Sequence, residues 1–306
     1  HQRLRDSAFE LQLAGAVFGR GGIDEALHQV EVVLHMLIDG VVADRISALD
    51  RGLAYGDGLF ESIRLVGATA PLWPRHMQRL SEGCDRLRMP APDPAQLWRE
   101  VQAVTRDMPH AVVRITITRG IGERGYAPPT APRPTRVVAA FAPPQTSSDS
   151  YTQGVRMRVC DIRLAEQPML AGMKHLNRLE QVLARAEWND PAIAEGVLRD
   201  SHGRVVSATM ANLFAVIDGA LLTPALDHCG VAGVARAEVL AVRPQTWVGE
   251  LTLDALHGAS EIFLSSSVRG ILPVRSLGER NYAAGGVARE LQQHWRDMGF
   301  PMEQGG

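Results

Sequence analysis

The chain has 306 residues, in which 32 Lys and Arg balance 34 Asp and Glu and 45% of the residues are hydrophobic. This length suffices for two domains with separate cores, and the even charge gives no electrostatic basis for binding nucleic acid or an anionic membrane. No run approaches the roughly 18 apolar residues of a membrane span. The three widely spaced cysteines predict free thiols in a reducing cytoplasm and no metal site.

The first 35 residues differ in character from the rest of the chain. His1 is not a natural start, and residues 36–40 read as the opening strand and turn of a domain. We therefore expect residues 1–35 to be an upstream extension, or an added segment, outside the core fold.

Short strands and helices follow between residues 36 and 142, which we predict to form a small N-terminal domain. Strands are expected at residues 60–66, 111–118 and 136–141, and helices at residues 74–87 and 93–106. Strict alternation predicts the strand at 111–118, because Val113, Ile115 and Ile117 share one face and polar residues occupy the other.

A stretch rich in proline and serine at residues 143–153 is the best candidate for an interdomain linker. Beyond it, residues 154–306 are predicted to form a larger, strand-rich domain. Its expected strands lie at residues 155–161, 194–199, 204–207, 211–217, 220–223 and 261–265, and its helices at 174–188, 234–242 and 287–295. Turn signals such as Asp218-Gly219 predict many hairpins, which favours an α+β fold over a doubly wound parallel sheet.

Lys174 is the most informative single residue. It precedes a run in which Leu179, Val182 and Leu183 recur at helical spacing, so we predict a helix over residues 174–188 with a buried apolar stripe. A lysine at the start of that helix would oppose the positive end of the macrodipole, which lowers the cost of losing its proton. An amine that sheds its proton can form a Schiff base. Taken alone, such a lysine is more often a solvated surface residue.

Several other segments have the composition of anion-binding sites. Residues 230–236 place two glycines before a helix, where backbone N–H groups can approach a phosphate closely. Residues 265–267 are three serines at a strand end, and Arg79 lies on the first predicted helix. Arg119 and Arg124 flank a glycine-rich loop and are suited to binding carboxylates. Each feature also has an ordinary interpretation as a turn, a loop or an exposed helical arginine.

Three runs, taken together and in order, resemble the class IV (fold type IV) pyridoxal-phosphate enzymes: DRGLAYGDGLFE at residues 50–61, KHLNRLE at 174–180 and HCGVAGV at 228–234. That family includes branched-chain and D-amino-acid aminotransferases and aminodeoxychorismate lyases. KHLNRLEQVL and the run RGIGERGY at residues 119–126 most resemble the lyases. The resemblance implies a two-domain α+β fold, with a small N-terminal α/β-sandwich domain and a larger strand-rich C-terminal pseudo-barrel domain.

The resemblance also implies roles for individual residues. Lys174 would bind pyridoxal 5'-phosphate covalently and act as the catalytic base. The residues implied at the cofactor are Arg79, Ser207, Asn212, the backbone of Gly233, Val234 and Ala235, and the hydroxyls of Ser266 and Ser267. For a substrate carboxylate, Arg124 is the first candidate and Arg119 the second.

The implied enzyme is a cytoplasmic homodimer that converts a small molecule, aminodeoxychorismate, to 4-aminobenzoate and pyruvate in folate biosynthesis. Two alternatives stay open. One is an aminotransferase that acts on D- or branched-chain amino acids. The other is a non-catalytic relative that binds the cofactor weakly, or binds only a partner protein.

Ser207 departs from the family pattern. The family has a glutamate five residues before the asparagine that matches Asn212, facing the pyridine nitrogen of the cofactor, and this chain has Ser207 there. A carboxylate keeps that nitrogen protonated and makes the cofactor a stronger electron sink, whereas a hydroxyl brings no charge. Since the lyase forms an aromatic product, we hypothesise that serine impairs transamination more than lyase chemistry.

Overall fold

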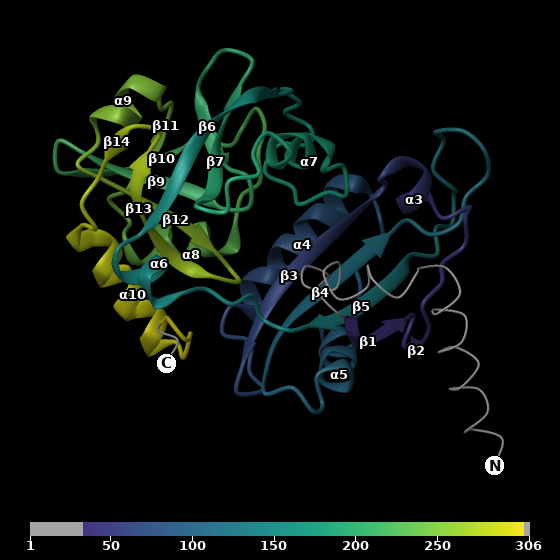
Figure 1. Ribbon diagram of the computed structural model, residues 1–306. Coiled ribbons are helices and arrows are strands. Elements are labelled where there is room, and N and C mark those ends of the chain that lie inside the picture. Colours follow the sequence, from purple (N-terminus) through teal and green to yellow (C-terminus); the bar gives the residue numbers. More distant parts are fainter. Residues whose placement is uncertain (1–32, 303–306) are drawn as a thin grey trace, which may run out of the picture. The chain divides into compact units, whose positions relative to one another are not determined.

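The structure is a computed structural model that describes residues 33–302 (Figure 1). The predicted upstream segment, residues 1–35, lies outside the described residues except for its last three. Strand β1 (Val33–Ile38) begins three residues before the strand expected at Met36. The expected turn follows it, where Asp39 and Gly40 both have positive φ.

The first sheet has five strands in the spatial order β2-β1-β5-β4-β3. Besides β1 these are β2 (Val41–Val42), β3 (Gly58–Val66), β4 (His110–Thr118) and β5 (Thr135–Phe141), and a short helix α3 (Arg51–Tyr55) precedes β3. Helices α4 (Trp73–Leu87) and α5 (Pro94–Val104) pack on one face, where Leu80 and Val101 join Ile63 and Ile115 in a common buried cluster. This sandwich of one sheet and two helices follows from the alternation of apolar residues along β3 and β4.

The second sheet has nine strands and is mixed. Its main path is β11-β10-β9-β12-β13-β6-β7-β8, and β14 pairs with β13. The strands are β6 (Val155–Leu164), β7 (Ile193–Asp200), β8 (Val205–Ala208), β9 (Asn212–Ile217), β10 (Ala220–Pro224), β11 (Trp247–Gly249), β12 (Glu261–Ser266), β13 (Gly270–Leu277) and β14 (Arg280–Asn281). The end strand β8 runs into β9 through a tight turn closed by a 2.9 Å bond from Ala208 N–H to Ala211 O, so the sheet curls back on itself.

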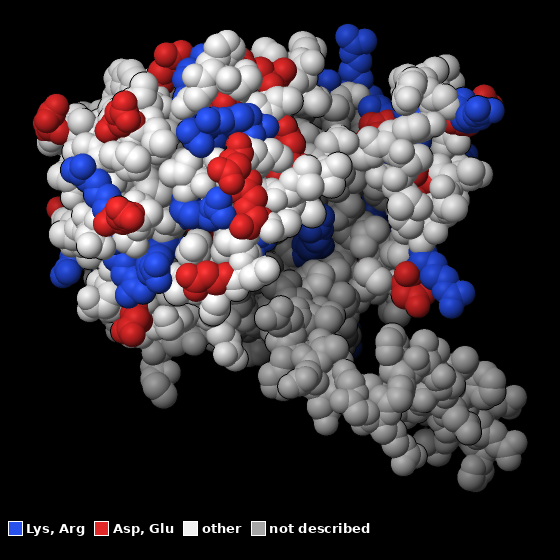
Figure 2. Space-filling model, turned by 45° about the horizontal axis from the view of Figure 1, so that its top comes forward, with Lys and Arg blue, Asp and Glu red and all other residues white. Residues whose placement is uncertain are grey.

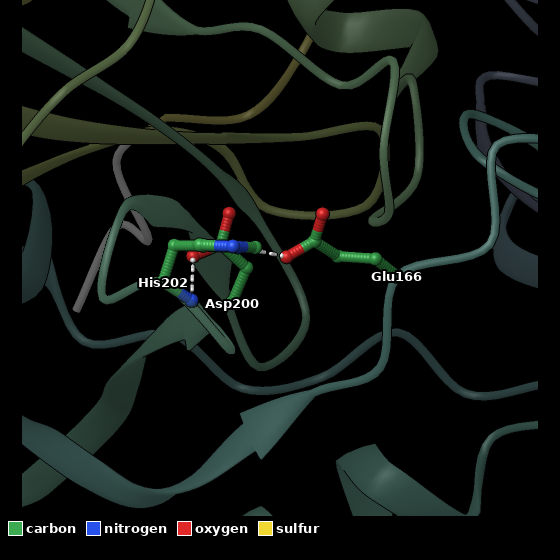
Figure 3. Close-up of side chains that lie close together, drawn as sticks. All are labelled: Glu166, Asp200 and His202. Atoms are coloured by element: carbon green, nitrogen blue, oxygen red, sulfur yellow. Dashed lines mark hydrogen bonds and ion pairs between the residues drawn. The ribbon is translucent and has the colours of Figure 1, made fainter.

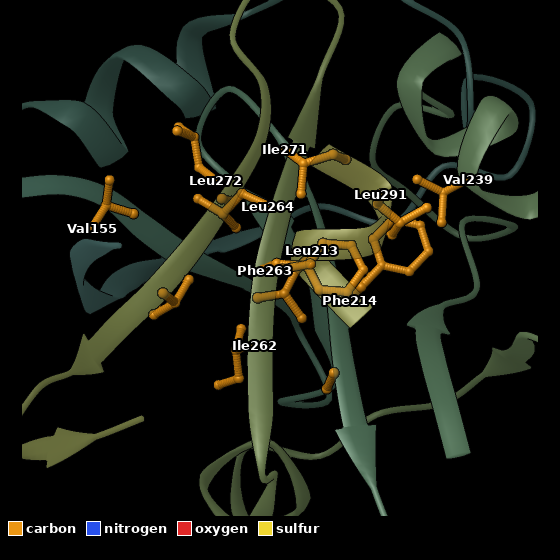
Figure 4. Packing of buried hydrophobic residues seen from close by; sticks show 14 of the residues in the cluster. Val155, Leu213, Phe214, Val239, Ile262, Phe263, Leu264, Ile271, Leu272 and Leu291 are labelled. Carbon is orange, nitrogen blue, oxygen red and sulfur yellow. The ribbon is translucent and has the colours of Figure 1, made fainter. Parts of the chain in front are cut away.

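The main hydrophobic core lies between this curled sheet and the C-terminal helices (Figure 4). Phe214 of β9 stacks on Phe263 of β12, with ring centroids 5.0 Å apart and planes 4° apart. Val239 and Leu291 close the cluster from α8 (Val234–Val242) and α10 (Gly286–Asp297). This packing fixes the strand ends and the start of α8 that border the site described below.

Some elements were not expected from the sequence. The stretch at residues 143–153 contains a short helix, α6 (Ser148–Thr152), whose Tyr151 is buried and donates a 3.0 Å hydrogen bond to Arg269 O. Strand β13 contains Pro273, a residue that argues against a central strand in any sequence-based reading. The short elements β2, α3, α9 (Leu253–Gly258), β11 and β14 were also missed.

The helix predicted at residues 174–188 is wrong in both its length and its burial. Helix α7 spans only Leu179–Arg185, and Leu179, Val182 and Leu183 are 69%, 60% and 52% exposed. The cause is pairing with β3, because Phe60 N–H bonds to Lys174 O and Leu176 N–H bonds to Gly58 O, each at 3.0 Å. Residues 174–176 are therefore extended, and the apolar stripe of α7 faces outward.

Charged side chains of both signs are interspersed on the face shown in Figure 2. This arrangement agrees with the even charge of the sequence. Within the described range 33–302, no helix combines the length and apolar character needed to cross a membrane.

Candidate active site

Lys174 lies where three segments distant in sequence meet. Besides its backbone bond to Phe60 of β3, the preceding turn is bound to the loop before α8. Gly172 N–H donates to Gly230 O, and Ala232 N–H donates to Gly172 O, both at 3.0 Å. Gly172 has a φ of +79°, which favours glycine at this turn. The backbone thus holds Lys174 between β3 and the loop at residues 230–233.

The amine of Lys174 is poised to lose its proton. Burial is the main cause that lowers the pKa of Lys174, to about 7, and the positive charge of Arg79 lowers it further while Glu61 opposes the shift. The side-chain nitrogen lies 4.3 Å from the centroid of the Phe60 ring. The macrodipole explanation offered from the sequence is wrong, because α7 begins only at Leu179.

Lys174 is also the only lysine of the chain; the other basic residues counted with it are arginines. Arginine stays protonated in proteins and cannot act as a neutral amine nucleophile. The one lysine of the chain is therefore the one side chain besides histidine that can readily become a neutral nitrogen base, and it lies at a half-buried position. This count was available from the sequence and was the strongest signal overlooked there.

Lys174 in the cofactor-free protein is expected to react with an amine-specific reagent ever faster from about pH 6 to about pH 8, with a midpoint near its pKa of about 7. The sign follows because the neutral amine is the nucleophile, and lowering the pKa makes it available at lower pH. The extent of labelling is measured by intact mass after short exposures to the reagent. Peptide mapping then distinguishes labelled Lys174 from a labelled N-terminal amine. A midpoint near pH 10, typical of an exposed lysine, would contradict the burial described here.

The N-terminus of α8 has the features of a phosphate site. The helix begins at Val234 with no side-chain cap, so the first-turn N–H groups of Val234 and Ala235 have no helical carbonyl to bind. Gly233 N–H is taken by Asn212 Oδ1 at 3.0 Å, and Asn212 Nδ2 donates to Val231 O at 2.9 Å. A Cβ on Gly233 would lie 2.1 Å from Asn212 Oδ1, so only glycine fits. Asn212 therefore shapes the loop, and Val234 and Ala235 are the open donors.

Arg79 of α4 reaches the same loop. Its guanidinium donates to Ala232 O at 3.0 Å and makes two hydrogen bonds to the carboxylate of Glu61. These contacts occupy three of the five N–H donors of an arginine and leave two for an anion. With the open N–H groups of α8, this donor set fits the phosphate that the sequence analysis expected here.

The predicted serines differ in how far their hydroxyls are already engaged. Ser267 donates to Ser62 O at 2.9 Å, whereas Ser266 Oγ accepts from Arg269 N–H at 3.0 Å and keeps its own hydrogen. Ser265, which pairs with Asn212 across β12 and β9, is buried, and its hydroxyl has no partner among residues 33–302. The structure therefore favours Ser266 over Ser267 as an anion donor and adds Ser265 to the candidates.

Ser207 lies on β8 next to Val206, the residue of this strand that contacts the loop at Gly230. Ser207 is 8% exposed, and its neighbour Val206 packs so closely on Gly230 that a Cβ there would approach Val206 Cγ1 to 2.7 Å. The buried carboxylate of Glu195 on adjacent β7 is bound by other residues of the protein. It accepts hydrogen bonds from Thr209 Oγ1 and Met210 N–H and pairs with Arg269. The role of Ser207 toward a cofactor stays a prediction.

Arg119 and Arg124 occupy different environments. Arg119 is 7% exposed and donates to both carboxylate oxygens of Asp57 and to the carbonyls of Leu87 and Arg88. Its guanidinium is thus committed to the protein, which weakens it as a substrate ligand. Arg124 is exposed and has no ionic partner in the described part of the chain.

A buried arginine holds the loop that carries Arg124. Arg51 of α3 donates to the carbonyls of Gly125, Tyr126 and Ala127, at 3.0, 3.0 and 3.3 Å, and pairs with Asp57 at 2.8 Å. The Tyr55 hydroxyl accepts from Gly125 N–H at 3.2 Å. These contacts give the glycine-rich loop a defined path and leave the Arg124 side chain outside.

Arg114 was missed in the sequence analysis. Its guanidinium carbon lies 4.2 Å from the centroid of the Phe60 ring, the same ring that Lys174 approaches. Arg114 and Lys174 therefore both approach the same aromatic ring. The alternation along β4 already placed Arg114 on the face away from the core, so its position was accessible from the pattern.

A second group of ionisable side chains consists of Glu166, Asp200 and His202, which lie close together (Figure 3). His202 Nδ1 contacts Glu166 Oε1 at 2.6 Å. Arg204 donates to Asp200 at 2.5 Å and to Glu166 at 3.2 Å, so a cation already neutralises the carboxylates. We interpret the group as an ion-pair network that closes the β7–β8 hairpin.

Comparison with known proteins decides the family. The model of the class IV amino-transferases matches residues 58–277, which is most of the chain. The chain belongs to the class IV aminotransferase family. The resemblance drawn from the three runs is thereby confirmed, and this member of the family is an enzyme.

Several proteins similar to this class IV enzyme are named as lyases, two of them at more than 30% identity. It is 34% identical over 267 residues to the aminodeoxychorismate lyase of Vibrio harveyi. The alignment covers 83% of this chain and 97% of the relative. It is 46% identical to the solved 4-amino-4-deoxychorismate lyase of Pseudomonas aeruginosa, with a TM-score of 0.82 and coverage of 86% of this chain and 98% of that one.

Aminotransferases are also similar to this class IV enzyme. The branched-chain-amino-acid aminotransferase of Escherichia coli K12 is 26% identical over 271 residues, covering 81% of this chain and 86% of the relative. A branched-chain amino acid aminotransferase solved with N-(5'-phosphopyridoxyl)-L-glutamate has a TM-score of 0.76 at 22% identity and covers 88% of this chain and 94% of that one. At that identity the likeness shows the fold alone. The expected two-domain α+β fold is confirmed.

Proposed function

We propose that this enzyme is a pyridoxal-phosphate-dependent aminodeoxychorismate lyase, which forms 4-aminobenzoate and pyruvate for folate biosynthesis. One observation carries the proposal. The only lysine of the chain has a pKa lowered to about 7, and its segment is bound to the loop that leads into the open N-terminus of α8 and accepts a hydrogen bond from Arg79. The two lyases at 34% and 46% identity support this reaction over that of the more distant aminotransferases.

A pyridoxal cofactor would supply an electron sink for the carbon that carries the substrate amine. Lys174 would bind it, and Arg79, the N–H groups of Val234 and Ala235 and the hydroxyl of Ser266 would hold its phosphate. Membership of the class IV aminotransferase family supports a cofactor of this class, and one aminotransferase of similar fold was solved with a phosphopyridoxyl compound.

Lys174 would also move a proton. Once the substrate amine displaces it from the cofactor, the neutral amine of Lys174 would remove the proton on the ring carbon that carries the substrate amine. The ether bond to the ring would then break, and a proton would pass to the departing three-carbon unit, which becomes pyruvate. Aminodeoxychorismate carries two carboxylates. Arg114, which approaches the same Phe60 ring as Lys174, would bind one, and Arg124 on its anchored loop would bind the other.

The main rival is an aminotransferase for D- or branched-chain amino acids. Such an enzyme needs an amino acid and a 2-oxo acid acceptor, whereas the lyase needs neither. We expect kcat/KM for aminodeoxychorismate to exceed that for any D- or branched-chain amino acid paired with an oxo acid. Steady-state assays on one preparation decide between them, and a preference for the amino acids would overturn the proposal.

Replacing Ser207 by glutamate is expected to raise transaminase activity relative to lyase activity. A carboxylate beside a pyridine nitrogen favours the protonated form of that nitrogen. Transamination depends on the resulting positive charge more than the lyase reaction does, because the lyase reaction is also driven by formation of an aromatic product. Both rates should be measured on wild type and Ser207→Glu, with Ser207→Gln as the uncharged control of equal size. An unchanged ratio would count against the hypothesis.

We also propose that the enzyme is a homodimer and that the second copy covers α7 and α3. Leu179, Val182 and Leu183 of α7 are all more than half exposed, and so is Leu53 of α3, at 64%. The two helices are neighbours, since Asn177 before α7 donates to Gly56 O at the end of α3, at 3.3 Å.

Leu183→Glu is expected to convert a dimer into a monomer, because it places a charge in the apolar contact. Light scattering after size-exclusion chromatography measures the mass directly. The control is Val248→Glu, which charges another exposed apolar residue, 46% exposed on β11. A wild-type monomer, or equal masses for both variants, would show that α7 is not the interface.

A further inference from the structure

We propose that His76 and Glu61 form a buried positioning pair that fixes the Arg79 guanidinium at the loop before α8. Glu61 lies on β3, and His76 and Arg79 lie one turn apart on α4. Glu61 and His76 are 1% and 0% exposed, and His76 Nδ1 lies 2.6 Å from Glu61 Oε2. Arg79 binds both oxygens of the same carboxylate and then reaches Ala232 O.

The ionisation states in this cluster are defined by its surroundings. Burial alone would raise the pKa of Glu61, but the charge of Arg79 and the hydrogen bond from His76 outweigh it and lower the pKa to about 2. Burial lowers the pKa of His76, so its ring is neutral. An ionised carboxylate only accepts hydrogen bonds, so the Nδ1 atom of His76 must carry the hydrogen.

This arrangement restricts Arg79 more than a single ion pair would. Two parallel N–H bonds fix the plane of the guanidinium against Glu61. His76 in turn fixes the carboxylate, because it donates to an oxygen that also accepts from Arg79. The remaining N–H donors of Arg79 are therefore held toward Ala232 and the start of α8. Among residues 33–302, the one side-chain hydrogen bond of His76 is to Glu61, and its Nε2 atom is buried without a partner, so we assign its effect on Arg79 to Glu61.

The inference rests on the proposed cofactor site, because it assigns to Arg79 the binding of a phosphate. Its test compares pyridoxal 5'-phosphate with pyridoxal, which carries the same aldehyde and no phosphate. Both can bind Lys174, so absorbance titration of the cofactor-free protein gives a Kd for each. Loss of the contact between Arg79 and the phosphate raises only the first Kd, whereas a change in the ionisation of Lys174, or general damage to the fold, affects both.

His76→Leu removes the hydrogen bond without changing any charge near the phosphate. We expect the Kd for pyridoxal 5'-phosphate to rise about tenfold and the Kd for pyridoxal to stay within about twofold of wild type. His76→Asn keeps an N–H donor at the Nδ1 position and is expected to restore most of the affinity. In an Arg79→Gln background, His76→Leu should have no further effect on either Kd.

Glu61→Asp is a second variant that keeps the negative charge. Its shorter side chain cannot reach Arg79 and His76 together, so it should reproduce the loss seen in His76→Leu. Glu100→Asp is the matched control, since buried Glu100 on α5 pairs with Arg136 through both oxygens away from β3. Glu100→Asp should leave the ratio of the two Kd values unchanged.

Two different failures can be told apart. If wild type binds pyridoxal 5'-phosphate no better than pyridoxal, the proposed cofactor site is wrong. If wild type prefers the phosphate compound but His76→Leu and Glu61→Asp retain that preference, only the positioning pair is overturned. Equal losses for both compounds, or an additive loss in the Arg79→Gln background, would also overturn it.

Discussion

Lys174→Ala is expected to lower lyase turnover by at least about 1,000-fold, because a catalytic base alone contributes about 100- to 10,000-fold and the covalent attachment is lost as well. The variant should also lose the absorbance band of a lysine-bound cofactor. Product release is measured by chromatography of 4-aminobenzoate, and the band by spectroscopy before and after borohydride.

Lys174→Arg is the matched control, because it keeps a long basic side chain but cannot supply a neutral amine. It should be as inactive as Lys174→Ala. Added methylamine should restore part of the activity of Lys174→Ala, because the substitution leaves space for a small amine. It should restore no activity to Lys174→Arg, which leaves no such space. Full turnover in either variant would show that another group does the chemistry.

Arg114→Gln is expected to lower kcat/KM for aminodeoxychorismate by about 10- to 100-fold, mainly through KM. A charge-assisted hydrogen bond to a carboxylate is worth about 1.5 to 3 kcal/mol, and glutamine keeps the length and polarity but not the charge. Steady-state kinetics with a coupled pyruvate assay provides the measurement.

Two further arginine variants make the assignment specific. Arg124→Gln should cause a similar loss, and the double variant should multiply the two losses if each arginine binds a different carboxylate. Arg106→Gln alters an exposed arginine after α5 and should have no effect. An unchanged KM in Arg114→Gln would remove Arg114 from the substrate site.

The sequence predicted most elements of the fold because their periodicities are strong. Helix α8 has the predicted bounds at Val234 and Val242, and β4 follows the alternation read from the sequence. Strand β13 was missed because Pro273 obscures its pattern. Helix α7 was extended too far toward the N-terminus, because a local pattern does not reveal that Lys174 pairs with Phe60 far away in the chain.

The candidate site was also predictable in part, where its signals are local in the sequence. A glycine before a helix and a lysine in a distinctive run are local signals, so Gly233 and Lys174 could be read directly. The partners of a guanidinium depend on tertiary packing. The resemblance ranked Arg124 before Arg119, but the residue pattern could not show that Arg119 is bound to Asp57 and that Arg124 is exposed. The pair of Glu61 and His76, and the contact of Arg114 with the ring of Phe60, became visible only with β3, β4 and α4 in place.

The most direct test of the account is to add aminodeoxychorismate to the cofactor-loaded protein with no oxo acid present and to count turnovers. We expect 4-aminobenzoate and pyruvate in equal amounts over many turnovers, with the cofactor band retained between cycles. Borohydride should then attach the cofactor to a single residue, Lys174, and stop the reaction. No product, or product that ends after one turnover per site, would contradict the lyase.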